Sequence, residues 1–160
     1  MTQSNRSIPL GRWLPPRMFV ASLALQAPGI ALTWPPRPSL FEIVAGGALI
    51  ALGVALNLWT DATFKRAGVV VVPFGATPRL MGDGPFRFSR NPMYLGMAMA
   101  SAGLAVATSV FANLAFAAAL TAWLNWAYVL PEERFLSEHF GPQYEAYRRR
   151  APRWLGWPGG

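Results

Sequence analysis

Four long apolar stretches that carry almost no charge constrain the fold of this chain more than any other feature. They cover residues 18–34, 40–60, 92–110 and 111–130. A helix of about 20 residues, at about 1.5 Å per residue, crosses the roughly 30 Å hydrocarbon core of a bilayer. The second and fourth stretches match that length, the third is slightly short, and the first contains Pro28-Gly29 and is expected to be kinked. A cleaved signal sequence is the alternative interpretation of the first stretch, although no small-x-small cleavage site follows it.

These stretches predict an all-α fold: a single domain over residues 1–160, built as an integral membrane helical bundle with four transmembrane helices. Residues 131–160 are expected to form a cytoplasmic segment with short interfacial helices. The first of these helices carries an apolar stripe that ends at Gly141-Pro142, and its basic end is expected to contact anionic lipid headgroups.

The composition supports a membrane protein and argues against a nucleic-acid-binding one. Hydrophobic residues make up 53% of the chain and charged residues 13%, whereas soluble domains carry about a quarter charged residues. The net charge of +7 comes from basic residues between the apolar stretches rather than in one patch, so we expect no nucleic-acid partner. With the N-terminus inside, 13 of the 14 basic residues fall on the cytoplasmic side and Arg37 falls outside. The positive-inside rule therefore predicts that both termini are cytoplasmic.

The third apolar stretch begins with a helix-start signature. Asn91 suits an N-cap, and Pro92 suits the first helical position. The free amides and positive dipole end of this helix would face the cytoplasm, where they can bind a carboxylate or phosphate. A capped transmembrane helix flanked by arginine is the simpler interpretation of the same residues. Upstream, residues 82–85 predict a turn, and the valines at 69–72 predict a short extended segment.

The fourth apolar stretch carries a polar stripe that ends in two carboxylates. Its members share one helical face because they are spaced by 4, 3 and 4 residues: Thr121, Asn125, Tyr128 and Glu132. Polar groups in a span usually face the bundle or a cavity, and helix–helix hydrogen bonding accounts for them equally well. Glu133 follows directly, and adjacent helical residues point about 100° apart, so the two carboxylates can serve different partners.

The short connection near residues 108–113 makes the third and fourth stretches antiparallel neighbours. Their cytoplasmic ends then lie side by side, which brings Arg90, Asn91 and Tyr94 close to Glu132 and Glu133. Helix-end amides, an arginine and two carboxylates at the mouth of an apolar bundle suit a ligand that has a carboxylate together with cationic or hydroxyl groups.

Cysteine and histidine chemistry is almost absent from the chain. There is no Cys and one His, so thiol nucleophiles are excluded and we expect no metal site. His139 lies on the apolar stripe after the carboxylate pair. A structural role is expected for it, with proton transfer as the alternative.

Residues 84–96, 132–136 and 140–147 resemble the membrane-embedded methyltransferases of the isoprenylcysteine carboxyl methyltransferase and phospholipid methyltransferase group. The resemblance runs from about Phe64 to Trp154, and it implies that S-adenosylmethionine binds at the cytoplasmic mouth. It also implies a cofactor site that contains Gly53, Asn91, Pro92, Tyr94, Gly96, Glu132 and Glu133, with Arg90 and Glu133 as catalytic residues. Isoprenylcysteine enzymes usually have His at the position of Asn91, so this chain is more similar to the branch that methylates lipid amines.

The resemblance leaves the methyl acceptor open. It implies a lipid-like or small hydrophobic molecule with an amine, carboxylate or thiol, reached through the membrane lipids. An amine must lose a proton, and Glu133 is the nearest candidate base. Two alternatives remain: an NADPH-dependent sterol-type membrane reductase, which needs room for a dinucleotide, and a non-enzymatic small membrane scaffold in which the arginines serve only as topology signals.

Overall fold

A computed structural model describes residues 15–33, 37–69 and 79–157, which form helices and connecting turns with no strand among them. The described helices are α1 (Pro15–Leu32), α2 (Leu40–Arg66), α3 (Pro92–Ala107), α4 (Leu114–Leu124), α5 (Leu130–Phe140) and α6 (Pro142–Arg150). Two short 3₁₀ turns, η1 (Gly84–Arg87) and η2 (Phe111–Asn113), and a π-helical turn, η3 (Asn125–Val129), complete the order. The prediction of an all-α fold is confirmed for these residues.

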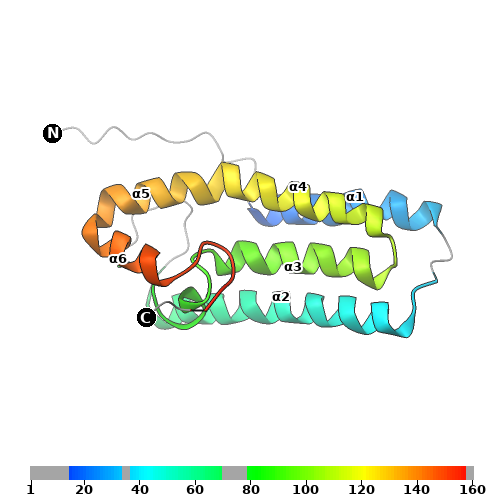
Figure 1. Ribbon diagram of the computed structural model, residues 1–160, viewed down its shortest axis with the longest axis horizontal. Helices are drawn as coiled ribbons and strands as arrows, with labels where there is room; N and C mark the ends of the chain where they lie inside the picture. The colour runs from blue at the N-terminus through cyan, green and yellow to red at the C-terminus, as the bar shows by residue number, and fades with distance from the viewer. Residues whose placement is uncertain (1–14, 34–36, 70–78, 158–160) are drawn as a thin grey trace.

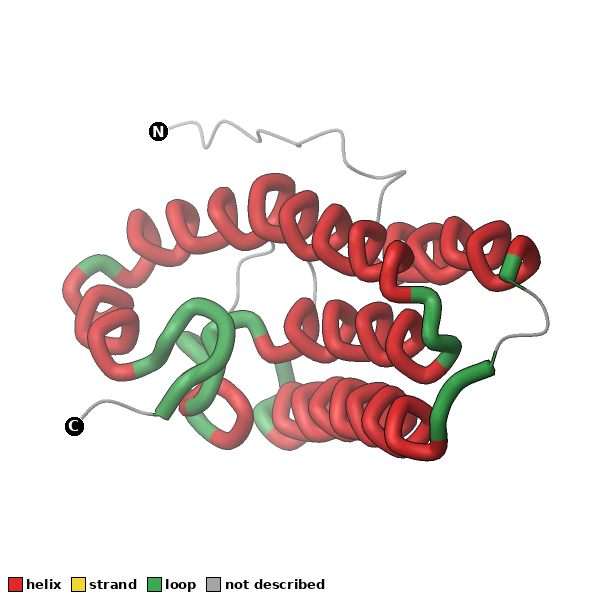
Figure 2. The backbone as a smooth tube through the Cα atoms, turned by 45° about the vertical axis from the view of Figure 1, so that its right-hand side comes forward, coloured by secondary structure: helices red, strands yellow, loops and turns green. Residues whose placement is uncertain are grey.

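The long helices run along one another as a bundle (Figure 1). At one end α2 finishes and α3 begins, and α5 and α6 extend past them; we call this the pocket end. At the opposite end α1 finishes, α2 begins, and α3 turns into α4. Figure 2 shows α4, η3 and α5 as one continuous rod, with α6 folded back at its tip.

At the end of the bundle opposite the pocket, the carboxylate of Glu42 links the start of α2 to the turn after α3. Ser39 caps α2 in a capping box: the Glu42 backbone N–H donates to its hydroxyl at 3.3 Å, and its own N–H donates to the Glu42 carboxylate at 2.6 Å. The hydroxyl of Ser109, a residue with a φ of 57° in the turn after α3, donates to the other Glu42 oxygen at 2.7 Å. The acidic residue of the second apolar stretch therefore connects two helix ends.

Glycines set the spacing of α2 and α3, which make the most extensive helix contact. Gly53 lies against Gly96, and Gly46 lies against Gly103, so each helix places two glycines seven residues apart at the contact. A Cβ on Gly53 would lie 2.5 Å from the Gly96 carbonyl oxygen, and one on Gly96 would lie 2.6 Å from the Gly53 carbonyl oxygen. Small residues allow helix backbones to approach this closely.

The fourth apolar stretch continues further than the sequence predicts. We expect its helix to end near residue 130, but the rod runs without a break from η2 to Phe140. Pro131 has no N–H, and its ring clashes with the carbonyl of residue 127 in a regular α-helix. We attribute the continuity to the wider turn of η3, which ends two residues before Pro131. The first predicted interfacial helix is therefore an extension of the rod, and α6 is the second.

Buried polar side chains attach α1 to α3. The hydroxyls of Ser22 and Ser101 are 2.9 Å apart, and Gln26 Nε2 donates to the Ser101 hydroxyl at 3.0 Å. The Asn113 side chain donates to the Gln26 carbonyl oxygen at 3.0 Å. All four residues are buried, and hydrogen bonds of this kind hold helices together in apolar surroundings. The helix continues past Pro28 to Leu32.

Two helices are long and apolar enough to cross a bilayer: α2 and the rod from Phe111 to Phe140. The apolar helix α3 has 16 residues. The outer face of α2 exposes several large apolar side chains, among them Leu40, Phe41, Val44, Leu52 and Leu58. Apolar surface of this extent is typical of contact with lipid or with another protein. These are the features of a membrane protein, while four spans and two cytoplasmic termini stay predictions.

Candidate active site

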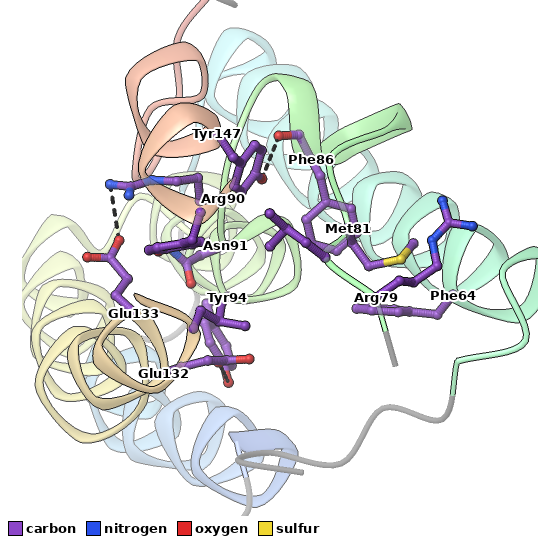
Figure 3. A pocket seen from close by; sticks show the side chains of 13 residues that line it. Phe64, Arg79, Met81, Phe86, Arg90, Asn91, Tyr94, Glu132, Glu133 and Tyr147 are labelled. Carbon is purple, nitrogen blue, oxygen red and sulfur yellow. Dashed lines mark hydrogen bonds and ion pairs between the residues drawn. The ribbon is translucent and has the colours of Figure 1, made fainter. Parts of the chain in front are cut away.

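A cavity of about 100 Å³ lies at the pocket end of the bundle (Figure 3). Its wall comes from the end of α2, the segment around η1, the start of α3, α5 and α6. Its described polar lining residues are Arg79, Arg90, Asn91, Tyr94, Glu132, Glu133, Tyr144 and Tyr147. The predicted proximity of the start of the third stretch to the carboxylate pair is therefore confirmed. These residues lie close together because α3 and the rod are antiparallel neighbours.

Glu133 is held by two arginines. Arg90 Nη2 lies 3.1 Å from Glu133 Oε1. Arg153 makes a bidentate contact, with its Nε donating to Oε1 at 3.0 Å and its Nη2 donating to Oε2 at 2.7 Å. The Glu133 and Arg90 side chains are 11% and 8% exposed, so their attraction is weakly screened by solvent. Both oxygens of Glu133 are occupied, which argues against the prediction that it acts as the base.

Arg90 has unused hydrogen-bonding capacity. Its Nε and Nη1 are buried and have no hydrogen-bond partner among the described residues. A buried donor left unpaired costs about 1–3 kcal/mol, and more when it is charged. Two arginines and one carboxylate also leave this cluster with one net positive charge. Both properties favour an anionic group, such as a carboxylate, from a ligand in the cavity that Arg90 lines.

Glu132 has a different environment from its neighbour. Its Oε2 accepts a hydrogen bond from the Tyr94 hydroxyl at 3.4 Å, and no ion pair joins it to a cation among the described residues. Tyr94 in turn packs against Tyr128 with ring centroids 6.0 Å apart. The prediction that the adjacent carboxylates serve different partners is confirmed. A carboxylate without a cationic partner in this setting favours a positively charged group from a ligand.

Asn91 does not cap α3 in the way predicted. Its side chain makes no capping hydrogen bond, and instead its Nδ2 donates to the Arg153 carbonyl oxygen at 3.1 Å. The Ser89 hydroxyl accepts from the Asn91 backbone N–H at 3.0 Å. Pro92 opens the helix as predicted. Asn91 therefore occupies the N-cap position, but the predicted side-chain cap is absent, and the Asn91 amide is tied to the returning C-terminal chain.

Gly53 and Gly96 lie in the contact between α2 and α3. Neither is among the described lining residues of the polar cavity or of the apolar cavity beside it. Their contact with each other explains why both positions are glycine. A direct role of either residue in cofactor binding remains a prediction that this geometry does not support.

A second, mainly apolar cavity of about 350 Å³ adjoins the polar one. It is lined by the start of α1, the end of α2 and the start of α3, and it includes Pro16, Met93 and Met97. The two cavities share Arg90, Asn91, Tyr94 and Glu132 in their walls. An apolar molecule in the second cavity would therefore lie next to the charged groups of the first.

Two buried tyrosines of α6 close the polar cavity. Burial raises the pKa of the Tyr144 phenol to about 12, with the charge of Glu133 acting in the same direction and Arg90 opposing it. Burial also raises the pKa of Tyr147, whose hydroxyl donates to the Phe86 carbonyl oxygen at 2.8 Å. Both phenols therefore stay neutral at physiological pH.

His139 and the valine segment contribute little to the described site. His139 stacks on Phe135 with ring centroids 5.7 Å apart and is absent from the described lining of both cavities. Val69 is buried next to Phe86 and Tyr147, while residues 70–72 lie outside the described part of the chain. The extended segment predicted for residues 69–72 therefore stays a prediction beyond Val69.

Arg153 is the site residue that sequence analysis missed. The sequence predicts that the C-terminal arginines serve topology and lipid contact, but Arg153 pairs with Glu133. Its position three residues after the end of a basic run gave no local signal for this contact. The preceding Ala151-Pro152, which stops α6 and turns the chain back, is the feature that could have indicated it.

The fold and site define a class: a small helical membrane protein with a polar cavity at one end of its bundle and an apolar cavity beside it. A family model described as phospholipid methyltransferase matches residues 41–143. The chain belongs to this family of membrane methyltransferases, which confirms the resemblance seen in the sequence.

The chain is also similar to the nickel-cobalt-cadmium resistance protein NccN of Alcaligenes xylosoxydans xylosoxydans. The two are 25% identical over 134 residues, covering 72% of this chain and 62% of that protein. The chain thus spans less than two thirds of the length of this relative. No solved structure matches the chain significantly.

Proposed function

We propose that the protein is an S-adenosylmethionine-dependent methyltransferase that acts on a lipid-like or small hydrophobic acceptor at the cytoplasmic membrane face. The observation that carries the proposal is the charge arrangement of the polar cavity. Arg90 offers buried, unpaired donors, while Glu132 offers a carboxylate without a described cationic partner. S-adenosylmethionine combines a carboxylate with an ammonium and a sulfonium, so its charges complement both groups.

The residues of the pocket have separate roles in this proposal. Arg90 holds the carboxylate of the cofactor, and Glu132 faces its cationic part. Tyr94 orients Glu132 through their hydrogen bond. Asn91 and Pro92 shape the turn that places Arg90 in the wall of the cavity.

When bound, S-adenosylmethionine would supply an electrophilic methyl group: the acceptor would bond to the methyl carbon in line as the carbon–sulfur bond breaks, and the electron pair would leave on sulfur as S-adenosylhomocysteine. The protein then has to align the acceptor and exclude water. This limited demand for acid–base chemistry is compatible with a chain that has one His and no Cys.

The apolar cavity is the proposed site of the acceptor. It opens beside α1 and α3 and shares Arg90 and Glu132 with the polar cavity, so an acceptor there would reach the transferred methyl group. Four spans with both termini in the cytoplasm would let the acceptor enter from the membrane lipids. For an amine acceptor we assign proton removal to Glu132 rather than Glu133, because arginines occupy both oxygens of Glu133.

Ligand binding and label transfer test this proposal. Purified protein in lipid nanodiscs is titrated calorimetrically with S-adenosylhomocysteine and with NADPH, and is incubated with methyl-labelled S-adenosylmethionine and a total lipid extract. Binding of S-adenosylhomocysteine alone, with label in one lipid fraction, is the expected result. Binding of NADPH instead would favour a reductase, and binding of neither ligand would favour a scaffold.

A further inference from the structure

The C-terminal strap, residues 151–157, lies directly against the segment that carries Arg90. The Arg90 backbone N–H donates to the Pro152 carbonyl oxygen at 2.9 Å, and the Gly156 N–H donates to the Phe88 carbonyl oxygen at 3.1 Å. The Phe88 and Trp157 rings also pack with centroids 6.0 Å apart. These contacts fix the strap beside the entrance to α3 and place the Arg153 side chain on Glu133.

Glu133 could neutralise Arg90 completely if it faced that residue alone. A bidentate arginine–carboxylate pair uses two guanidinium donors and cancels both charges. In the structure, the bidentate partner of Glu133 is Arg153, and Arg90 contributes one contact through Nη2. Arg153 therefore keeps Glu133 from taking up the remaining donors of Arg90, which stay unpaired among the described residues.

We propose that Arg153 is a positioning residue for the anion-binding function of Arg90. By holding Glu133 in a bidentate contact, it leaves the cluster with a net positive charge and leaves Arg90 donors for the carboxylate of the ligand. Arg153 itself does not line either cavity among the described lining residues, and its side chain is 41% exposed. The inference rests on the proposed function, because it assigns the amino-acid end of the cofactor to Arg90.

A pair of ligands separates this role from general support of the fold. S-adenosylhomocysteine carries the carboxylate, whereas 5′-methylthioadenosine has the same nucleoside without the amino-acid end. Binding of both is measured calorimetrically for wild type, Arg153→Ala and the matched control Arg149→Ala, which removes an exposed arginine of α6. Unfolding temperatures without ligand are recorded for each, and Arg153→Gln serves as a second variant if Arg153→Ala fails to fold.

Arg153→Ala is expected to weaken S-adenosylhomocysteine binding about 10- to 100-fold, the loss of one charge-assisted hydrogen bond, and to leave 5′-methylthioadenosine binding unchanged. The double variant Arg153→Ala/Glu133→Gln is expected to recover most of the lost affinity, because a neutral side chain no longer competes for Arg90. Arg149→Ala should bind both ligands as wild type does.

Unchanged S-adenosylhomocysteine binding in Arg153→Ala, an equal loss for both ligands, or no recovery in the double variant would overturn the positioning role. Each of these results requires a wild type that binds S-adenosylhomocysteine. A wild type that binds neither ligand would instead overturn the proposed function itself, so the two failures are distinguishable.

Discussion

Glu132 and Glu133 are adjacent in the sequence, but their surroundings give them opposite properties. Glu133 is neutralised by Arg90 and Arg153, whereas Glu132 has the Tyr94 hydroxyl as its described partner. Both oxygens of Glu133 accept hydrogen bonds from Arg153, whereas Glu132 accepts one from a neutral phenol. At the scale of single residues, the arginine contacts therefore decide which carboxylate is available for chemistry.

Glu132→Gln keeps the size of the side chain and removes its charge. With an amine acceptor, we expect methyl transfer to fall by roughly 100-fold or more, the usual contribution of a positioned general base. Label transfer to the acceptor fraction measures this rate, and Glu133→Gln is the matched comparison. A Glu132→Gln variant that transfers label at the wild-type rate would remove Glu132 from the mechanism.

Tyr144 gives a prediction for alkaline pH. Its pKa is about 12 in the folded protein, against about 10 for a solvated phenol. The stability gained by burying the neutral phenol is complete below pH 10 and is lost as the pH rises toward 12. The unfolding temperature should therefore fall more steeply between pH 10 and 12 in wild type than in Tyr144→Phe. The tyrosinate absorbance of wild type minus that of Tyr144→Phe reports the ionisation of Tyr144. This difference should rise with a midpoint near pH 12, and a midpoint near pH 10 would contradict the prediction.

At the scale of helices, the close contact of α2 and α3 depends on glycines that face each other. Gly47 provides an internal comparison because it lies on the same helix as Gly53, yet a Cβ there would meet no described atom within 4 Å. Glycines in one apolar stretch thus have different structural roles, which their sequence context does not reveal.

Gly53→Ala is expected to destabilise the protein by about 1–3 kcal/mol, because its Cβ would force the backbones of α2 and α3 apart. Gly47→Ala should be neutral or slightly stabilising, since alanine favours helix over glycine. Thermal unfolding in detergent measures both. Equal stability of the two variants would mean that α2 and α3 do not approach each other as described.

The sequence predicted some helix boundaries correctly and others incorrectly. The starts of α2 and α3 match the predicted starts of the second and third stretches, at Leu40 and Pro92. A span that ends at residue 130 and a separate interfacial helix after it were predicted, whereas the two form one rod that ends at Phe140. The π-turn at η3 that carries the helix past Pro131 depends on how the chain relaxes around the proline ring, which has no simple sequence pattern.

At the scale of the whole molecule, the arrangement of charges gives a test of topology. The natural sequence contains no Cys, so each introduced Cys is a unique label site. Arg37 and Arg149 are both exposed; Arg37 precedes the start of α2 and Arg149 lies in α6, and the start of α2 and α6 are at opposite ends of the bundle (Figure 1). In right-side-out vesicles, an impermeant maleimide should label Arg37→Cys directly and Arg149→Cys only after permeabilisation. Labelling of both from outside would contradict the proposed four-span topology.

The sequence by itself determined the helical class, the family, and the proximity of Arg90 and Tyr94 to the carboxylate pair. These follow from apolar length, helix periodicity and a short connection, which are local properties of the chain. Only the tertiary structure decided which carboxylate is paired, that the Asn91 side chain bonds to the strap instead of capping α3, and that Arg153 belongs to the site. Such contacts join residues more than 60 positions apart, or depend on how the chain returns after α6, and their geometry is set by packing of the complete bundle.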